Sequence, residues 1–191
     1  ETPSTLDGFY DMLVSFRDGD ANGNGEADEI PYSFVYDGDG YNMPLGAFGF
    51  VNLRHDVIDG QYVYVPAQEN FRHYLEFMHK LYTEGLLDSK IFTQTTEEYN
   101  AKMSTGVIGV MPNSGAAIIG LDEYLKTTSL KPMTSEYNET PVHPGRAQEV
   151  DKFGMVITDK CSEEKAIAAI KLLDYFYSQE GTFLIKCGPE Y

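Results

Sequence analysis

The stretch Asp18-Gly-Asp-Ala-Asn-Gly-Asn-Gly-Glu-Ala-Asp-Glu29, followed by Ile30-Pro31, is the most distinctive part of the sequence. Glycines and short polar side chains favour turns, because they tolerate unusual backbone angles and hydrogen-bond to the nearby backbone. Before this stretch, residues 4–18 predict a helix that Ser4 or Thr5 caps and that carries apolar residues at helical spacing. After it, residues 32–36 predict a strand. The stretch is therefore a long turn between a helix and a strand.

The same stretch has oxygen-bearing side chains at the alternating positions of a calcium-binding loop. Calcium prefers roughly six to eight oxygen ligands, which a tight loop can supply from one edge. One register of the motif D-x-[DN]-x-[DN]-G-x5-E runs from Asp18 to Glu29, but it places Gly25 where an apolar residue is required. The preferred register uses Asp20, Asn22, Asn24, the backbone carbonyl of Glu26, Asp28 and Glu29. The ion would be structural, and the alternative is a turn cluster without metal.

The rest of the sequence alternates predicted strands and helices. Asp59-Gly60 is a hairpin signal, because both residues tolerate the positive φ angles of a tight turn. Thr95 and Glu98 form a capping box, and Gly85 ends the helix before them. The predicted elements are a hairpin at 56–65, helices at 68–84, 95–103, 115–126, 162–177 and 178–186, and buried strands at 107–111 and 153–157, with an irregular connection at 131–150. The helix from 162 carries an apolar stripe that is expected to be buried. This mixture predicts an α/β fold.

The composition is that of a folded, acidic chain. Its 191 residues include 14 basic and 30 acidic side chains, which give a formal net charge of −16. Apolar residues at 42% exclude wholesale disorder, and the excess of acid argues against binding to nucleic acid. No apolar run approaches the roughly 20 residues that span a bilayer. Two independent thiols, Cys161 and Cys187, are preferred over one bridge.

Several segments together resemble family 1 extracellular solute-binding proteins of ABC transporters, in particular the lipoprotein-type sugar binders of Gram-positive bacteria. The resemblance is carried by Thr5-Leu-Asp-Gly-Phe-Tyr-Asp-Met-Leu13, residues 20–31, Leu81-Tyr-Thr-Glu-Gly-Leu-Leu-Asp88, Val107-Ile-Gly-Val-Met111 and residues 166–181. It extends over nearly the whole chain, and residues 20–31 are its most specific part. Alginate-binding members of the family hold calcium in a matching loop.

The resemblance implies a periplasmic-binding-protein-like fold of type II, in which two lobes close around a ligand. Residues 1–150 would form most of the second lobe, and residues 151–191 the return strand and helix pair of the first, so the chain would be partial. The implied function is the non-catalytic capture of an oligosaccharide, a related sugar or a uronate outside the cell. The implied partners are the ligand and an ABC permease, with surface tethering as a lipoprotein through an anchor that this chain lacks.

Five residues are candidates for contact with a ligand. Phe34, Tyr36 and Tyr41 follow the calcium-like loop, and their rings could stack on sugar C–H surfaces. Roles in the core are the equal alternative for these three. Asn113 and Ser114 follow a buried strand and precede a helix, whose free N–H groups suit polar ligand atoms. Simple capping of that helix is the alternative for these two.

No residues are singled out for catalysis. Ser114 lacks a G-x-S-x-G setting, and the four histidines form no i,i+4 metal pair. His73 and His79 are expected to face solvent. Two alternative functions stay open at this point: a calcium-stabilised carbohydrate-active enzyme and a calcium-dependent interaction module. Turnover of a glycoside would identify the first, and a second calcium loop is the usual mark of the second.

Overall fold

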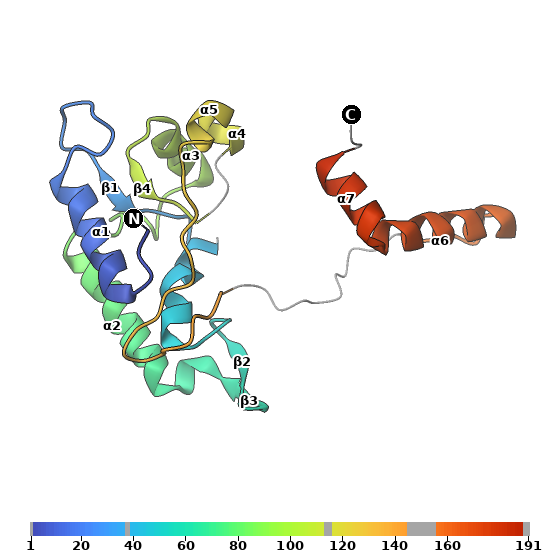
Figure 1. Ribbon diagram of the computed structural model, residues 1–191, viewed down its shortest axis with the longest axis horizontal. Helices are drawn as coiled ribbons and strands as arrows, with labels where there is room; N and C mark the ends of the chain where they lie inside the picture. Colours follow the sequence, from blue (N-terminus) through green and yellow to red (C-terminus); the bar gives the residue numbers. More distant parts are fainter. Residues whose placement is uncertain (1, 37–38, 113–115, 145–155, 189–191) are drawn as a thin grey trace. The chain divides into compact units, whose positions relative to one another are not determined.

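The computed structural model describes residues 2–36, 39–112, 116–144 and 156–188. The chain divides into two units, residues 1–148 and 149–191 (Figure 1). The described elements of the first unit are α1 (Leu6–Asp18), β1 (Ile30–Tyr32), the 3-10 helix η1 (Asp39–Phe48), β2 (His55–Ile58), β3 (Gln61–Tyr64), the 3-10 helix η2 (Val65–Ala67), α2 (Glu69–Thr83), α3 (Thr96–Ser104), β4 (Ile108–Val110), α4 (Ala116–Ile119) and α5 (Leu121–Tyr124). The second unit holds α6 (Glu163–Tyr177) and α7 (Gln179–Cys187). The assignment of the two parts of the chain to two lobes stays a prediction.

The first unit is built around a short parallel strand pair. β1 pairs with β4 in the register Ile30↔Ile108 and Tyr32↔Val110. On its other side, Tyr32 forms a parallel bridge with Leu87. Helix α1 packs against β1, and Gly109 of β4 lets the Phe16 ring approach, since a Cβ there would lie 2.8 Å from that ring. The predicted mixture of helices and strands is confirmed, and this strand pair is parallel.

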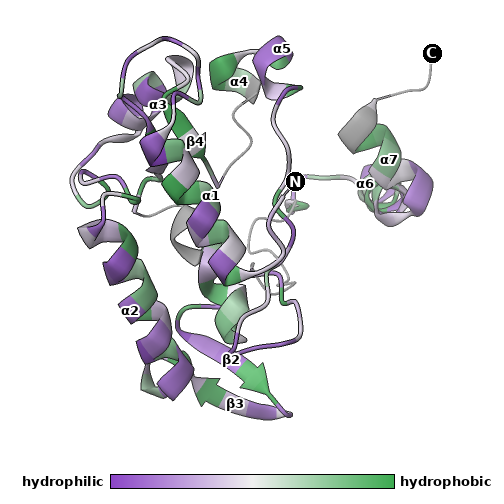
Figure 2. Ribbon diagram, turned by 60° about the vertical axis from the view of Figure 1, so that its left-hand side comes forward, coloured by the Kyte–Doolittle hydropathy of each residue, from purple (hydrophilic) through white to green (hydrophobic). Residues whose placement is uncertain are grey.

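The core of the first unit lies where α1 and α2 cover this strand pair and η1. Both helices alternate hydrophobic and hydrophilic residues along their length (Figure 2). The α1 stripe is buried at Leu6, Phe9 and Leu13, as the spacing predicts. The largest fully buried side chains are Tyr32, Tyr74, Tyr99, Phe9, Phe34 and Phe48. Aromatic rings therefore fill much of the interior of a chain that has no tryptophan.

The predicted caps and the predicted hairpin are present. The Thr5 hydroxyl accepts a hydrogen bond from the Gly8 N–H at 3.1 Å, which caps α1. Thr95 and Glu98 form the reciprocal capping box of α3. β2 and β3 pair across Asp59-Gly60, where both φ angles are positive, 52° and 74°. This backbone geometry matches the right-handed twist of the strands, so the turn fixes their register.

Other elements differ from the predictions for local reasons. The first strand spans Ile30–Tyr32 and not the predicted residues 32–36. Beyond Ser33 a side chain bonds to the backbone in place of a neighbouring strand, since the Gln94 amide donates to the Phe34 carbonyl. The helix predicted at 115–126 is two short helices, which Gly120 separates with a φ angle of 85° and a ψ angle of 158°. Residues 39–48 form a 3-10 helix that was not predicted. The strand predicted at 153–157 falls largely outside the described residues, and residues 156 and 157 are not in a strand.

The apolar stripe of α6 is not buried, contrary to the prediction. α6 has no buried residue among those described, and Ile167 and Ile170 are 48% and 56% exposed. The reason is that, among the described elements of the second unit, α7 alone packs against it. Gly181 allows this packing, since a Cβ there would meet the Tyr175 carbonyl oxygen. Among the described residues, no helix has the length and apolar character to cross a membrane.

Candidate functional site

The carboxyl ends of β1 and β4 meet at one edge, because the two strands are parallel. In open α/β sheets, ligands bind outside this edge. β1 runs into residues 33–36, and β4 runs into Met111 and Pro112. The sequence candidates Tyr36, Asn113 and Ser114 thus follow strands that end together. Residues 113–115 lie outside the described part of the chain.

An exposed aromatic cluster of Tyr36, Phe92 and Tyr82 lies at this edge. The ring centroids of Tyr36 and Phe92 are 5.5 Å apart, and those of Phe92 and Tyr82 are 6.1 Å apart. The three side chains are 48%, 63% and 41% exposed, respectively. They come from the segment that follows β1, the α2–α3 connection and the last turns of α2. The cluster therefore offers exposed ring surface to a ligand, while the Tyr82 hydroxyl donates to the Ser89 carbonyl at 3.4 Å.

Sequence reasoning found only Tyr36 of this cluster. Tyr82 lies inside the helix predicted at 68–84, and Phe92 lies in an irregular stretch where neither helical nor strand periodicity marks a side chain. Phe34 is fully buried and packs on Tyr32 at 5.1 Å, so it takes the core role that was its alternative. The backbone of Tyr41 belongs to η1, and its side chain lies outside the described residues.

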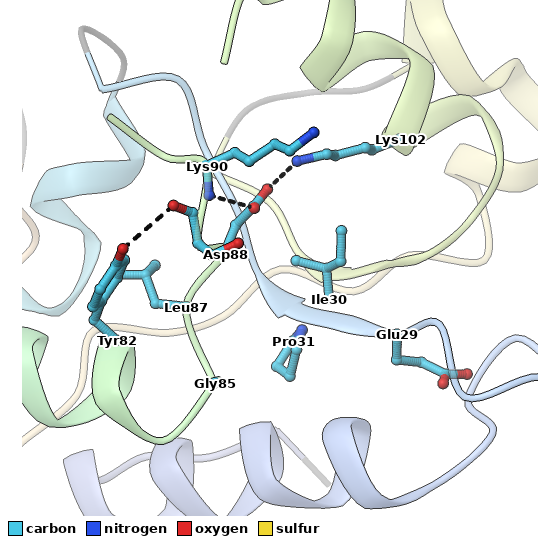
Figure 3. Close-up of a pocket in the computed structure, with 10 residues that line it drawn as sticks. Glu29, Ile30, Pro31, Tyr82, Gly85, Leu87, Asp88, Lys90 and Lys102 are labelled. Carbon is cyan, nitrogen blue, oxygen red and sulfur yellow. Dashed lines mark hydrogen bonds and ion pairs between the residues drawn. The ribbon is translucent and has the colours of Figure 1, made fainter. Parts of the chain in front are cut away.

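A buried polar network holds the chain just before Tyr36. One Asp88 carboxylate oxygen accepts hydrogen bonds from the Ser33 hydroxyl at 2.7 Å and from the Lys102 ammonium at 2.5 Å. The other accepts from the Lys90 backbone N–H at 3.0 Å (Figure 3). Gln94 donates to the Phe34 carbonyl at 2.7 Å and accepts from Lys102 at 2.8 Å. The network thereby ties the end of β1 to α3 and to the α2–α3 connection.

The pKa of Asp88 is set by two opposing effects. Burial raises the pKa of this carboxyl, whose side chain is 4% exposed. Hydrogen bonds from Lys102, the Lys90 N–H and Ser33 lower it, and their combined effect is larger. The pKa therefore lies below its ordinary value, and Asp88 is a carboxylate at neutral pH. A carboxylate held this way positions the backbone and does not serve as a general acid.

A cavity of about 340 Å³ opens beside this network, at the start of β1. Tyr82, Asp88, Lys90 and Lys102 line it together with Glu29 (Figure 3). Its volume is at the low end of the range of small-molecule pockets. Because Tyr82 belongs to both, the cavity adjoins the aromatic cluster, and Glu29 links it to the calcium-like loop.

The calcium-like loop is closed by its own hydrogen bonds. The two Asp20 carboxylate oxygens accept from the Asn24 N–H at 3.0 Å and the Gly25 N–H at 2.8 Å. The Asn24 amide donates to Asp28 at 3.2 Å, and the Asn22 amide does so at 3.4 Å. Gly23 and Gly25 have φ angles of 74° and 82°, which glycine adopts without strain. The Asn22, Asn24 and Asp28 side chains of the preferred register therefore face one another, whereas the Asp20 carboxylate bonds to the loop backbone.

Of two carboxylates at the ends of the loop, Asp18 is a ligand in only one register, whereas Glu29 is a ligand in both. Asp18 accepts from the Arg17 guanidinium at 2.7 and 3.0 Å and is held outside the loop. Glu29 Oε1 accepts from the Ala21 N–H at 2.8 Å, whereas its Oε2 is buried and has no hydrogen-bond partner in the described structure. No three His, Cys, Asp or Glu side chains gather as a metal-ligating group within the described ranges.

The prediction that His73 faces solvent is wrong. Its side chain is 24% exposed and its ring stacks on Tyr137 at 4.4 Å, with the planes 16° apart. Tyr137 in turn stacks on Phe48 at 5.3 Å. His73 is thus half-buried, because the 131–144 segment folds back over α2.

Several known proteins resemble this chain, although no family model matches it. It is 36% identical over 116 residues to the fructooligosaccharide ABC transporter substrate-binding protein FusA of Streptococcus pneumoniae, which covers 58% of this chain and 21% of FusA. It is 30% identical over 123 residues to the lipoprotein LipO of Bacillus subtilis, with 61% of this chain and 24% of LipO covered. The chain therefore matches less than a quarter of either relative.

Solved structures agree with this similarity. FusA in complex with kestose has a TM-score of 0.60 at 28% identity, and covers 73% of this chain and 29% of that one. An EF-hand mutant of FusA with fructo-nystose has a TM-score of 0.65 at 25% identity, over 100% of this chain and 39% of that one. A solute-binding protein of Bifidobacterium longum infantis, described as binding HMO, shares the fold over 100% of this chain and 42% of its own, with a TM-score of 0.67 at 22% identity. The predicted periplasmic-binding-protein-like α/β fold is confirmed for a part of that fold.

Proposed function

We propose that this chain is part of a receptor that captures an oligosaccharide for import. The premise is its homology to a part of the ABC-transporter substrate-binding proteins. The observation that carries this proposal is the aromatic cluster of Tyr36, Phe92 and Tyr82 at the carboxyl edge of β1. Its exposed rings suit the C–H faces of a sugar. FusA, the relative seen with kestose, supports an oligosaccharide as the ligand class.

The capture is non-catalytic in this proposal. Both relatives are named for binding or anchoring and not for a reaction. Asp88 is the buried carboxylate beside the cluster. It is paired with Lys102, and its pKa lies below the ordinary value of an aspartate. A glycosidase would instead need two carboxyl groups that flank the scissile bond, one of them with a raised pKa. In this proposal the sugar is therefore bound and released without chemical change.

Calcium binding at the loop forms part of the proposal. The ligands would be Asp20, Asn22, Asn24, the carbonyl of Glu26, Asp28 and Glu29. The buried, unpartnered Glu29 Oε2 supports this fit, since a cation would satisfy it. The ion pair between Asp18 and Arg17 supports the register that starts at Asp20, because it engages the carboxylate that the other register would use. A bound calcium ion would neutralise carboxylates that otherwise repel one another, and the EF-hand mutant of FusA shows that a relative was altered at such a motif.

The setting follows from the same premise. An ABC permease is the proposed partner, and the proposed location is the outer surface of the cell. LipO is named a lipoprotein, which supports tethering by a lipid anchor. Delivery to a permease requires that the receptor bind its ligand more tightly in one conformation than in another.

The substitution Phe92→Ala tests the cluster. It is expected to weaken kestose binding about tenfold, roughly 1.4 kcal/mol, because the central ring of the cluster is lost. Isothermal titration calorimetry of the wild type and the variant measures this change. Phe183→Ala is the matched control, since Phe183 is similarly exposed (58% against 63%) but lies on α7. Equal loss in both variants, or no loss in either, contradicts the assignment.

Chromatography of the sugar after incubation separates capture from catalysis. Intact kestose after incubation with a large molar excess of sugar over protein is the expected result. Release of fructose or sucrose at a rate that depends on the protein would instead identify a carbohydrate-active enzyme.

A further inference from the structure

The outer face of the β2–β3 hairpin is aromatic and exposed. His55 and Val57 of β2 lie opposite Tyr64 and Tyr62 of β3. Tyr62 is 73% exposed, Val57 64% and Tyr64 57%. The His55 ring stacks on Tyr62 at 5.3 Å, with the planes 17° apart, and contacts Tyr64 at 5.7 Å. These four side chains form a continuous surface, which we call the hairpin plate.

The hairpin plate is held by the other face of the same hairpin. Ile58 packs against the core of the first unit. The Asp56 carboxylate accepts from the Val51 N–H at 2.7 Å. At the base, the Val65 N–H donates to the Arg54 carbonyl at 2.9 Å. The backbone that carries the rings is therefore held in place before any ligand arrives, which lowers the entropy cost of binding.

The hairpin plate is separate from the aromatic cluster. In both views of the first unit, the hairpin lies at the end opposite α4 and α5 (Figures 1 and 2). None of its four side chains lines the cavity beside Asp88. The described structure gives neither the Tyr62 nor the Tyr64 hydroxyl a hydrogen-bond partner. These hydroxyls can bond to a ligand at the rim of the hairpin plate.

We propose that the hairpin plate binds the ring face of a neutral carbohydrate, as a second contact surface for the oligosaccharide. The choice of carbohydrate rests on the proposed function. Flat aromatic rings stack on the C–H face of a sugar, while the Tyr62 and Tyr64 hydroxyls and the His55 ring nitrogens hydrogen-bond to its hydroxyls. The surface would hold an additional sugar unit, or a second sugar chain.

Size and charge favour this occupant over a protein or a membrane. Exposed tyrosines contribute about 150–250 Å² each at full exposure, so the four side chains present on the order of 400 Å². A stable protein interface needs about 800 Å² per partner. The hairpin plate has no carboxylate and no ammonium group, which suits an uncharged ligand. The net charge of −16 opposes binding to an anionic lipid surface.

A titration of the isotope-labelled full chain with kestose, followed by NMR, tests the hairpin plate. Ring resonances of His55, Tyr62 and Tyr64 are expected to shift and to saturate together. The double variant Tyr62→Ala/Tyr64→Ala is expected to weaken the binding seen at His55 at least tenfold. The double variant Tyr62→Phe/Tyr64→Phe retains the rings and is expected to lose less. Tyr177→Ala is the matched control, because Tyr177 is 88% exposed on α6 and is expected to have no effect.

The same titration separates this inference from the proposed function. Shifts at Tyr36 and Phe92 without shifts at the hairpin overturn the hairpin plate alone. Shifts at the hairpin without shifts at Tyr36 and Phe92 support the hairpin plate and overturn the role of the cluster. Shifts of the hairpin rings that depend on protein concentration in the absence of sugar overturn the inference in favour of self-association. Absence of all shifts overturns both proposals.

Discussion

Replacement of Asp88 by alanine is expected to lower the free energy of unfolding by about 3 kcal/mol. Removal of one partner of a buried ion pair typically costs about 3–5 kcal/mol, because the other charge stays buried and unpaired. The lower value applies here, since the Lys102 side chain is 20% exposed. The Ser33 hydroxyl and the Lys90 N–H lose their acceptor as well. Urea denaturation of the wild type and the variant measures the difference.

An exposed ion pair provides the control for Asp88→Ala. Glu123 and Lys126 form a pair at 2.6 Å, with side chains that are 61% and 69% exposed. Glu123→Ala is expected to change stability by less than about 1 kcal/mol, because water screens such pairs. If Asp88→Ala cost no more than Glu123→Ala, the network would not hold the end of β1.

The same network makes a signed prediction about pH. The pKa of Asp88 is lowered in the folded state, so its contribution to stability is present above the ordinary pKa of an aspartate, about 3.9. That contribution is lost as the pH falls below about 4 towards the folded-state pKa. Asp88→Asn is expected to remove this part of the acid sensitivity. An unchanged acid dependence in Asp88→Asn would show that other carboxyl groups account for it.

Addition of calcium to the metal-free chain is expected to raise the melting temperature by roughly 5–10 °C. At a calcium concentration about 100 times its dissociation constant, binding to the folded state alone contributes about 2.7 kcal/mol. In a chain of this size, each kcal/mol corresponds to roughly 2–4 °C. Thermal melts in calcium and in EDTA measure the shift.

Two carboxylates of the loop provide matched variants for the calcium prediction. Asp20→Asn is expected to abolish the shift, because Asp20 is the first ligand of the preferred register and its carboxylate accepts from the Asn24 and Gly25 N–H groups. Asp18→Asn is expected to keep it, because Asp18 is paired with Arg17. The reverse pattern would assign the register that starts at Asp18. No shift in the wild type would identify a turn cluster without metal.

Local signals predicted the elements that local interactions determine. Asp59-Gly60 predicted the hairpin, and Thr95 with Glu98 predicted the start of α3, because turn and cap geometry depends on a few neighbouring residues. The break at Gly120 was not predicted, since a glycine inside a helical pattern is often tolerated. The exposure of α6 was not predicted either. Its periodicity shows which face is apolar but not whether a partner covers that face.

The candidate site could be predicted only in part. Tyr36 was found because it follows a predicted strand, and the loop ligands were found because their spacing is regular. Phe92 and Tyr82 join Tyr36 through tertiary packing across more than 40 residues of sequence, which no local pattern encodes. Asp88 and Lys102 meet for the same reason, 14 residues apart and on different elements.

The most direct test of the central claim is an NMR titration of the calcium-loaded chain with kestose that is read at the rings of Tyr36 and Phe92. The proposed function predicts saturable shifts of both rings, their weakening in Phe92→Ala as read at Tyr36, and full recovery of intact kestose afterwards. The absence of saturable shifts at these two rings, or the appearance of hydrolysis products, would contradict the capture of an oligosaccharide at the carboxyl edge of β1.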